Sequence, residues 1–233
     1  MNSEVLQSLR AVSAHVGSLA ELFAADVERD WLVLDACGIH ADFSRQQVNQ
    51  PLFEQLLSAA ESVDIASRFK AMGSGAIVNA TEQRAVGHLA LRGSATDSAM
   101  SQLAQLQLQR ANKLSNDIRG GVHRGSTGQP ITDIVNIGIG GSDLGPVMAH
   151  AAMRRYLDGP RIHFVSNIDA AHLDDCLATL QPSTTLFVIA SKTFTTLETL
   201  SNARRARLWL ENAGIESAAH LVAVTAAPGE AVQ

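Results

Sequence analysis

The first half of the chain carries apolar residues at helical spacing. Between residues 6 and 22 they recur at positions 6, 9, 12, 16, 19 and 22, which predicts one amphipathic helix. The same spacing follows a proline over residues 52–63 and recurs over residues 100–118, so two further helices are expected. Residues 31–34, Trp-Leu-Val-Leu, fit either a short strand or a buried connector, and the pattern does not decide between them.

The pattern changes after Gly120 and Gly121, where short β-branched or aromatic runs begin to alternate with helical stretches. Expected strands lie at residues 134–137, 162–165, 186–189 and 221–224. Expected helices lie at residues 143–157, 169–179 and 196–212. This alternation predicts an α/β fold in which a parallel sheet is flanked by helices. We therefore divide the chain into a mainly helical segment, residues 1–120, and an α/β domain, residues 121–233.

The last expected strand and the Thr225 that closes it are followed by only eight residues, Ala-Ala-Pro-Gly-Glu-Ala-Val-Gln. A further crossover and another parallel strand need more residues than these. We therefore expect the 233 residues to be part of a longer protein, with the α/β domain truncated at its C-terminal end.

Composition is that of an ordinary globular protein, with 46% apolar and 18% charged residues. The net charge of −5 and the pI of about 5.9 create no general positive field, so neither nucleic acid nor a membrane is an expected partner. Cys37 and Cys176 stand far apart, and no leader or long apolar span occurs, so we expect reduced thiols in a cytoplasmic protein. The eight histidines lack metal-ligand spacing, so no metal site is expected.

A glycine-rich loop, NIGIGGSDLGP of residues 136–146, follows the first expected strand. Glycines let the backbone approach a ligand, and amides at the start of the next helix attract a phosphate. Gly138, Gly140 and Gly141 are therefore candidates for a close approach of the backbone to a phosphate, although a tight strand-to-helix turn explains these glycines equally well. The Rossmann fingerprint, the nucleotide P-loop and the GxSxG hydrolase elbow are all unmet here.

A second polar loop, ASKTFTTLET of residues 190–199, follows the third expected strand. Thr195 and Glu198 have the spacing of a capping box, which satisfies the first amides of a helix. Lys192 needs another explanation, because a cation near a helix N-terminus opposes the macrodipole unless an anion lies between them. A phosphate monoester, with a charge of roughly −1.5 to −2, is such an anion. Both loops follow strands of one parallel sheet, so one phosphorylated ligand is expected to touch both.

These stretches resemble the phosphoglucose isomerase family. The segment VNATEQRAVGHLALR of residues 78–92 is also similar to a helical stretch of that family, so residues 81–92 are expected to form a helix. The resemblance runs over essentially the whole chain and implies a sugar-isomerase-type domain. It implies that Gly141 and Ser142 line the sugar, and that the family's phosphate loop corresponds to Ser191, Lys192, Thr193, Thr195 and Thr196.

The resemblance further implies a cytoplasmic homodimer that interconverts glucose 6-phosphate and fructose 6-phosphate through a cis-enediol, in glycolysis and gluconeogenesis, without metal or organic cofactor. The family's Glu base, its His and Lys acid/base group and its Arg come from segments that have no match in residues 1–233. We therefore expect no catalytic residue in this chain and no turnover by it alone. The alternative, of a different class, is a non-catalytic phosphosugar-sensing module, which shares the sheet and the Ser/Thr phosphate loop.

Overall fold

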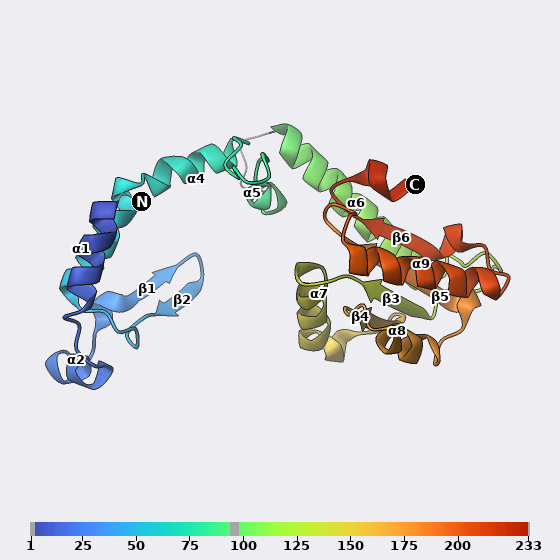
Figure 1. Cartoon of the computed structure of the whole chain (residues 1–233), viewed down its shortest axis with the longest axis horizontal. Coiled ribbons are helices and arrows are strands. Elements are labelled where there is room, and N and C mark those ends of the chain that lie inside the picture. Colours follow the sequence, from blue (N-terminus) through green and yellow to red (C-terminus); the bar gives the residue numbers. More distant parts are fainter. Residues whose placement is uncertain (1–2, 94–97, 233) are drawn as a thin grey trace. The chain divides into compact units, whose positions relative to one another are not determined.

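The computed structural model describes residues 3–93 and 98–232, and the chain divides into two compact units (Figure 1). The first unit is Met1–Leu106 and the second is Gln107–Gln233. The boundary falls inside α6 (Ser98–Arg119), whereas the division expected from the sequence follows that helix. It falls there because the second half of α6 packs on the sheet of the second unit, where Ile118 joins Ile131 and Leu186 in a buried cluster.

The first expected helix is two helices, α1 (Ser3–Ser13) and α2 (Leu19–Ala25), so the prediction of a single helix over residues 6–22 is wrong. The break occurs at Ser18, which is the N-cap of α2 and forms a capping box with Glu21. Ser18 Oγ accepts the Glu21 amide at 3.3 Å, and Glu21 Oε2 accepts the Ser18 amide at 2.7 Å. Local capping therefore outweighs the continuous apolar spacing.

A β-hairpin follows, in which β1 (Val33–Ala36) pairs antiparallel with β2 (Ile39–Asp42). The segment left open at residues 31–34 is the end of a 3₁₀ turn, η1 (Asp30–Leu32), and the start of β1. Arg29 anchors this region, since it is only 1% exposed and its Nη2 donates to two carbonyl oxygens. These belong to Gln46, at 3.1 Å, and Val48, at 2.6 Å.

The helix predicted at residues 52–63 is confirmed as α3 (Gln50–Ser62), and α4 (Ile65–Gly73) follows it. The helix predicted at residues 81–92 is wrong, because only α5 (His88–Leu91) is helical there. Asn79 and Arg84 instead exchange backbone hydrogen bonds of 3.2 Å across a turn. The Asn79 side chain also accepts the Glu82 amide at 3.1 Å, and such local bonding competes with helix formation.

The second unit is built on a sheet of four parallel strands, which confirms the predicted α/β fold. Its order is β4-β3-β5-β6, and each strand lies within one residue of its predicted range. The strands are β3 (Asp133–Ile137), β4 (Arg161–Val165), β5 (Thr185–Ala190) and β6 (Leu221–Val224). The helices between them are α7 (Gly141–Ala152), α8 (Ala170–Leu177) and α9 (Leu197–Asn212). Short 3₁₀ helices accompany them: η2 (Arg154–Tyr156), η3 (Pro182–Thr184), η4 (Ser217–His220) and η5 (Pro228–Val232).

Helices cover both faces of this sheet (Figure 1). Alternate strand residues such as Val135 and Phe187 are fully buried in the core formed with α8 and α9. There the rings of Phe187 and Trp209 pack edge to face, with their centroids 6.0 Å apart. The intervening residues face α6 and α7, and His150 of α7 contacts the Phe164 ring of β4 at 5.6 Å. Because both faces are buried, the strand ends are where polar loops can meet a ligand.

Candidate functional site

A hollow of about 440 Å³ lies at the carboxyl ends of β3, β5 and β6. Gly141 and Ser142 line it from the first predicted loop, and Lys192 lines it from the second. The two loops therefore meet at one edge of the sheet, as their positions after parallel strands predict. Within the described part of the chain, the other predicted residues of the second loop are near this hollow in sequence but outside its lining: Ser191, Thr193, Thr195 and Thr196.

The first turn of α7 is held against β3 by Asn136. Its Nδ2 donates to the carbonyl oxygen of Ser142 at 3.1 Å. Within an α-helix that carbonyl would accept the amide four residues later, but this position is Pro146, which has no amide hydrogen. The side chain of Asn136 therefore replaces a helical hydrogen bond that Pro146 removes.

The glycines of the first loop differ in what they do. A Cβ at Gly138 would lie 2.7 Å from the Ser142 carbonyl oxygen, so close packing of strand and helix requires glycine there. Gly140 has a φ of +60° and precedes the helix, so the turn accounts for it. A Cβ at Gly141 would meet nothing within 4 Å, and Gly141 lines the hollow. The tight-turn explanation thus covers Gly138 and Gly140 and does not account for Gly141.

Fewer helix amides face the hollow than the sequence suggests. The Ser142 amide donates to the Ile139 carbonyl oxygen at 3.2 Å, and the Asp143 amide donates to that of Gly140 at 3.0 Å. Among the contacts of the described residues, the Gly141 amide and the Ser142 hydroxyl have no protein partner. They are the two donors that the start of α7 offers to a ligand.

The second loop is a tight turn closed by Ser191, which is 3% exposed. Its amide continues the sheet by donating to the Val224 carbonyl oxygen at 3.0 Å. Its Oγ accepts the Phe194 amide at 3.2 Å, and Phe194 has a left-handed φ of +56°. The turn brings the hydroxyls of residues 191, 193, 195 and 196 together in pairs at the end of β5.

The threonines of this turn pair with other hydroxyls rather than cap the helix. Thr193 Oγ1 lies 2.7 Å from Thr195 Oγ1, and Ser191 Oγ lies 3.2 Å from Thr196 Oγ1. The predicted capping box of Thr195 and Glu198 is wrong, because the N-cap of α9 is Thr196 and no side chain caps it. Each pair of hydroxyls holds two protons and uses one of them in its own hydrogen bond, so each pair keeps one proton that it can donate to another group.

Two residues that line the hollow, Asn136 and Thr225, were not predicted from the sequence. Asn136 is 8% exposed, and its polar side chain within the apolar run of residues 134–137 is the signal that could have identified it. Thr225 follows β6, and its hydroxyl donates to the Lys192 carbonyl oxygen at 3.2 Å. The only sequence signal for Thr225 is its place at the end of the fourth parallel strand.

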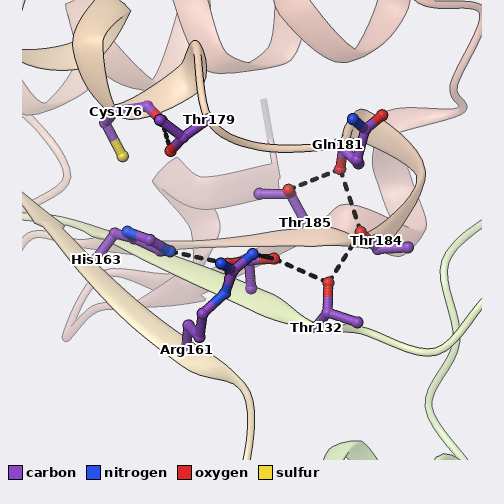
Figure 2. A network of polar contacts seen from close by, with 9 residues as sticks. Thr132, Arg161, His163, Cys176, Thr179, Gln181, Thr184 and Thr185 are labelled. Carbon is purple, nitrogen blue, oxygen red and sulfur yellow. Dashed lines mark hydrogen bonds and ion pairs between the residues drawn. The ribbon is translucent and has the colours of Figure 1, made fainter.

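A second polar network lies at the opposite, amino edge of the sheet. Thr132, Arg161 and His163, which are labelled in Figure 2, all bond the carboxylate of the buried Asp133. Arg161 contacts it twice, with Nε to Oδ1 at 2.8 Å and Nη2 to Oδ2 at 2.9 Å. Burial alone raises the pKa of Asp133, but the hydrogen bonds from Arg161, His163 and Thr132 outweigh it and hold that pKa below its ordinary value.

Cys176 lies on α8 beside this network (Figure 2). Burial, together with the negative charge of Asp133, raises the pKa of the Cys176 thiol. A raised pKa disfavours the thiolate, which is the nucleophilic form. We therefore assign this network a structural role, because it joins the start of β3 to the start of β4. It lies at the edge of the sheet opposite the hollow.

The described residues 3–93 and 98–232 contain neither a candidate metal site nor a candidate membrane-spanning helix. No group of His, Cys, Asp and Glu side chains within them forms a candidate metal site. None of their helices is both long enough and apolar enough to span a membrane.

Comparison with known proteins decides the family. A sequence model of phosphoglucose isomerase matches residues 42–233. The chain belongs to the phosphoglucose isomerase family. The glucose-6-phosphate isomerase of Bartonella bacilliformis is 44% identical over 97% of this chain and 44% of its own length. That of Brucella anthropi is 48% identical over 80% of this chain and 35% of its own length.

A solved structure agrees with the sequence comparison. The glucose-6-phosphate isomerase of Chlamydia trachomatis superposes with a TM-score of 0.77 at 28% identity, over 96% of this chain and 44% of that one. The chain thus spans less than half the length of these phosphoglucose isomerase relatives.

Proposed function

We propose that this chain forms the sugar-phosphate-binding part of a glucose-6-phosphate isomerase. The observation that carries the proposal is the hollow at the carboxyl ends of the strands, where Gly141, Ser142 and Lys192 converge from two loops. Its lining includes three hydrogen-bond donors: the Lys192 ammonium, the Ser142 hydroxyl and the Gly141 amide. Such a set suits an anion.

The phosphate binds at the second loop, between Lys192 and the hydroxyl pairs of residues 191–196. Ser191, Thr193, Thr195 and Thr196 supply neutral donors, and Lys192 supplies the charge. The hydroxyls orient the phosphate, because the turn fixes the positions of their oxygens and each pair keeps one proton to donate. One Lys holds a phosphate as a point charge and less tightly than an Arg cluster does, which suits a substrate that must leave.

The sugar lies at the first loop, beside Gly141 and Ser142. Gly141 leaves room for the sugar, because its missing side chain opens on the hollow. The Gly141 amide and the Ser142 hydroxyl then donate to sugar oxygens. Holding the phosphate and the sugar at two separate points fixes the reacting carbons, and this positioning is what binding energy contributes to catalysis.

The proton transfer itself belongs to residues outside this chain. Isomerisation through a cis-enediol needs a carboxylate base, an acid/base group at the ring oxygen and a cation beside the enediolate. The family supplies these from segments that match nothing in residues 1–233. We infer that the whole protein is a cytoplasmic homodimer of glycolysis and gluconeogenesis which needs no metal or organic cofactor, and that this chain alone does not turn over substrate.

Titration of the 233-residue chain with fructose 6-phosphate, followed through backbone amide shifts, tests the binding proposal. The expected result is saturable movement of the amides of residues 141–142 and 191–196, with fructose producing none at equal concentration. Absence of these shifts at millimolar fructose 6-phosphate contradicts the proposal. A sensing module gives the same shifts, so isomerase assay of the complete gene product containing this chain separates an enzyme from a sensor.

A further inference from the structure

We propose that Thr225 is a positioning residue for Lys192 in the binding of a sugar phosphate. The inference rests on the proposed function and adds a residue at the end of β6 to the binding site formed at the ends of β3 and β5. Thr225 directly follows β6, and both Thr225 and Lys192 line the hollow. Thr225 therefore links the edge strand to the loop that carries the charge of the site.

Two donors from the end of β6 hold the carbonyl oxygen of Lys192. The Ala226 amide donates to it at 3.0 Å, and the Thr225 hydroxyl donates to it at 3.2 Å. One residue earlier, the Ser191 amide donates to the Val224 carbonyl oxygen at 3.0 Å, which extends the pairing of β5 with β6. The backbone of residues 191 and 192 is thus fixed on the sheet before the loop turns at Phe194.

The proton of the Thr225 hydroxyl is used by the backbone. While it donates to Lys192, its oxygen accepts the Ala227 amide at 3.0 Å. A hydroxyl has one proton, so a Thr225 in this arrangement has none to give to a phosphate. Its contribution to binding is therefore indirect and passes through the backbone of Lys192.

Fixing this backbone matters because lysine carries its charge on a flexible stem of four carbons. Ordering such a side chain on binding costs conformational entropy, and a mobile main chain adds to that cost. An anchored Lys192 carbonyl confines the ammonium to positions within reach of the hollow. Loss of the anchor is expected to weaken phosphate binding while leaving the core of the sheet intact.

The test compares Thr225→Val, which keeps the shape and removes the hydroxyl, with Thr225→Ser, which keeps the hydroxyl. Both are titrated calorimetrically with fructose 6-phosphate as 233-residue chains. The Thr225→Val variant is expected to raise Kd about three- to tenfold, the effect of one hydrogen bond, and Thr225→Ser to bind like the wild type. Thr179→Val is the matched control, because the Thr179 hydroxyl donates to the Cys176 carbonyl oxygen at the end of α8. It is expected to leave Kd unchanged.

An unchanged Kd in folded Thr225→Val overturns the inference, as does a Thr225→Ser variant that binds as weakly as Thr225→Val. If Thr225→Val does not fold, amide shifts of the wild type decide: the Ala226 and Ala227 amides must respond to fructose 6-phosphate with the Kd of the Lys192 amide. If the Ala226 and Ala227 amides show no shift change, the inference about Thr225 is overturned. A wild-type chain that binds no fructose 6-phosphate contradicts the proposed function itself, and this inference with it.

Discussion

The side-chain amide of Asn136 donates to the carbonyl oxygen of Ser142 at 3.1 Å, in place of the backbone amide that Pro146 lacks. This bond ties the central strand β3 to the loop proposed to hold the sugar. Asn136 is 8% exposed, so its side-chain amide is largely shielded from water. The hydrogen bond therefore bears on both stability and ligand affinity.

Asn136→Leu is expected to destabilise the second unit by about 1–2 kcal/mol, since it leaves the Ser142 carbonyl oxygen without its donor. It is also expected to raise Kd for fructose 6-phosphate about fivefold or more, because the Gly141–Ser142 turn is no longer tied to β3. Urea unfolding and calorimetric titration measure the two effects. Equal stability and equal Kd in the variant and wild type would show that the bond has neither role.

Two glycine substitutions separate packing from ligand space. Gly138→Ala is expected to destabilise the fold by about 1–3 kcal/mol, because its Cβ would lie 2.7 Å from the Ser142 carbonyl oxygen. Gly141→Ala is expected to leave the unfolding free energy within about 1 kcal/mol, since its Cβ would meet nothing within 4 Å. It is nevertheless expected to weaken fructose 6-phosphate binding by filling the hollow. A Gly141→Ala chain that binds normally would remove Gly141 from the sugar site.

Removal of the charge at Lys192 is expected to have the largest effect on affinity. Lys192→Met should raise Kd for fructose 6-phosphate about 10- to 100-fold, the value of a charge-assisted hydrogen bond, and flatten the dependence of Kd on salt. Lys70→Met, an exposed substitution on α4, is the control for net charge. If both variants bind with equal Kd, the charge at Lys192 does not act on the phosphate.

Acid stability depends on Asp133. Its pKa is lower in the folded chain than in the unfolded chain, so the ionised carboxylate stabilises the fold above the unfolded pKa. That contribution is lost as pH falls below about 4 and through the folded pKa. Asp133→Asn is expected to cost about 1–3 kcal/mol at pH 7 and to give a flatter loss of stability between about pH 4 and 2.

Urea unfolding from pH 7 downward measures the Asp133 effect. Asp158→Asn is the matched control, because Asp158 pairs with Arg119 at 2.7 Å on the surface with 65% of its side chain exposed. Exposed pairs contribute little, so this variant should follow the wild-type curve. An Asp133→Asn curve that runs parallel to the wild type through the acid range would contradict the assigned pKa direction.

The strands were predictable because each is a short apolar run of the length that a buried parallel strand needs. Helix boundaries were less predictable, because side chains compete for backbone amides. Ser18 caps a new helix inside the single helix expected at residues 6–22. The Asn79 side chain accepts the Glu82 amide and so forms a turn where the helix of residues 81–92 was expected to begin. Thr195 bonds Thr193 rather than the amides of α9. Each error arises where a short polar side chain had several local partners of similar strength.

The two loops of the candidate site were predictable from their place after parallel strands. The contacts that support them were not, because they join distant parts of the chain. Thr225 donates to a carbonyl 33 residues away, and only the pairing of β5 with β6 brings the two together. Asn136 lies six residues from Ser142, but its role follows from the bend at Gly138–Gly140. Sequence pattern locates the edge of the sheet, and tertiary pairing decides which residues act there.

A crystal structure of this chain with fructose 6-phosphate bound tests most directly whether the two loops share one ligand. We expect the phosphate within hydrogen-bonding distance of Lys192 Nζ and the hydroxyls of residues 193, 195 and 196, with the sugar against Gly141 and Ser142. A phosphate bound elsewhere, or a sugar directed away from the Gly141–Ser142 turn while the phosphate occupies the second loop, would contradict it.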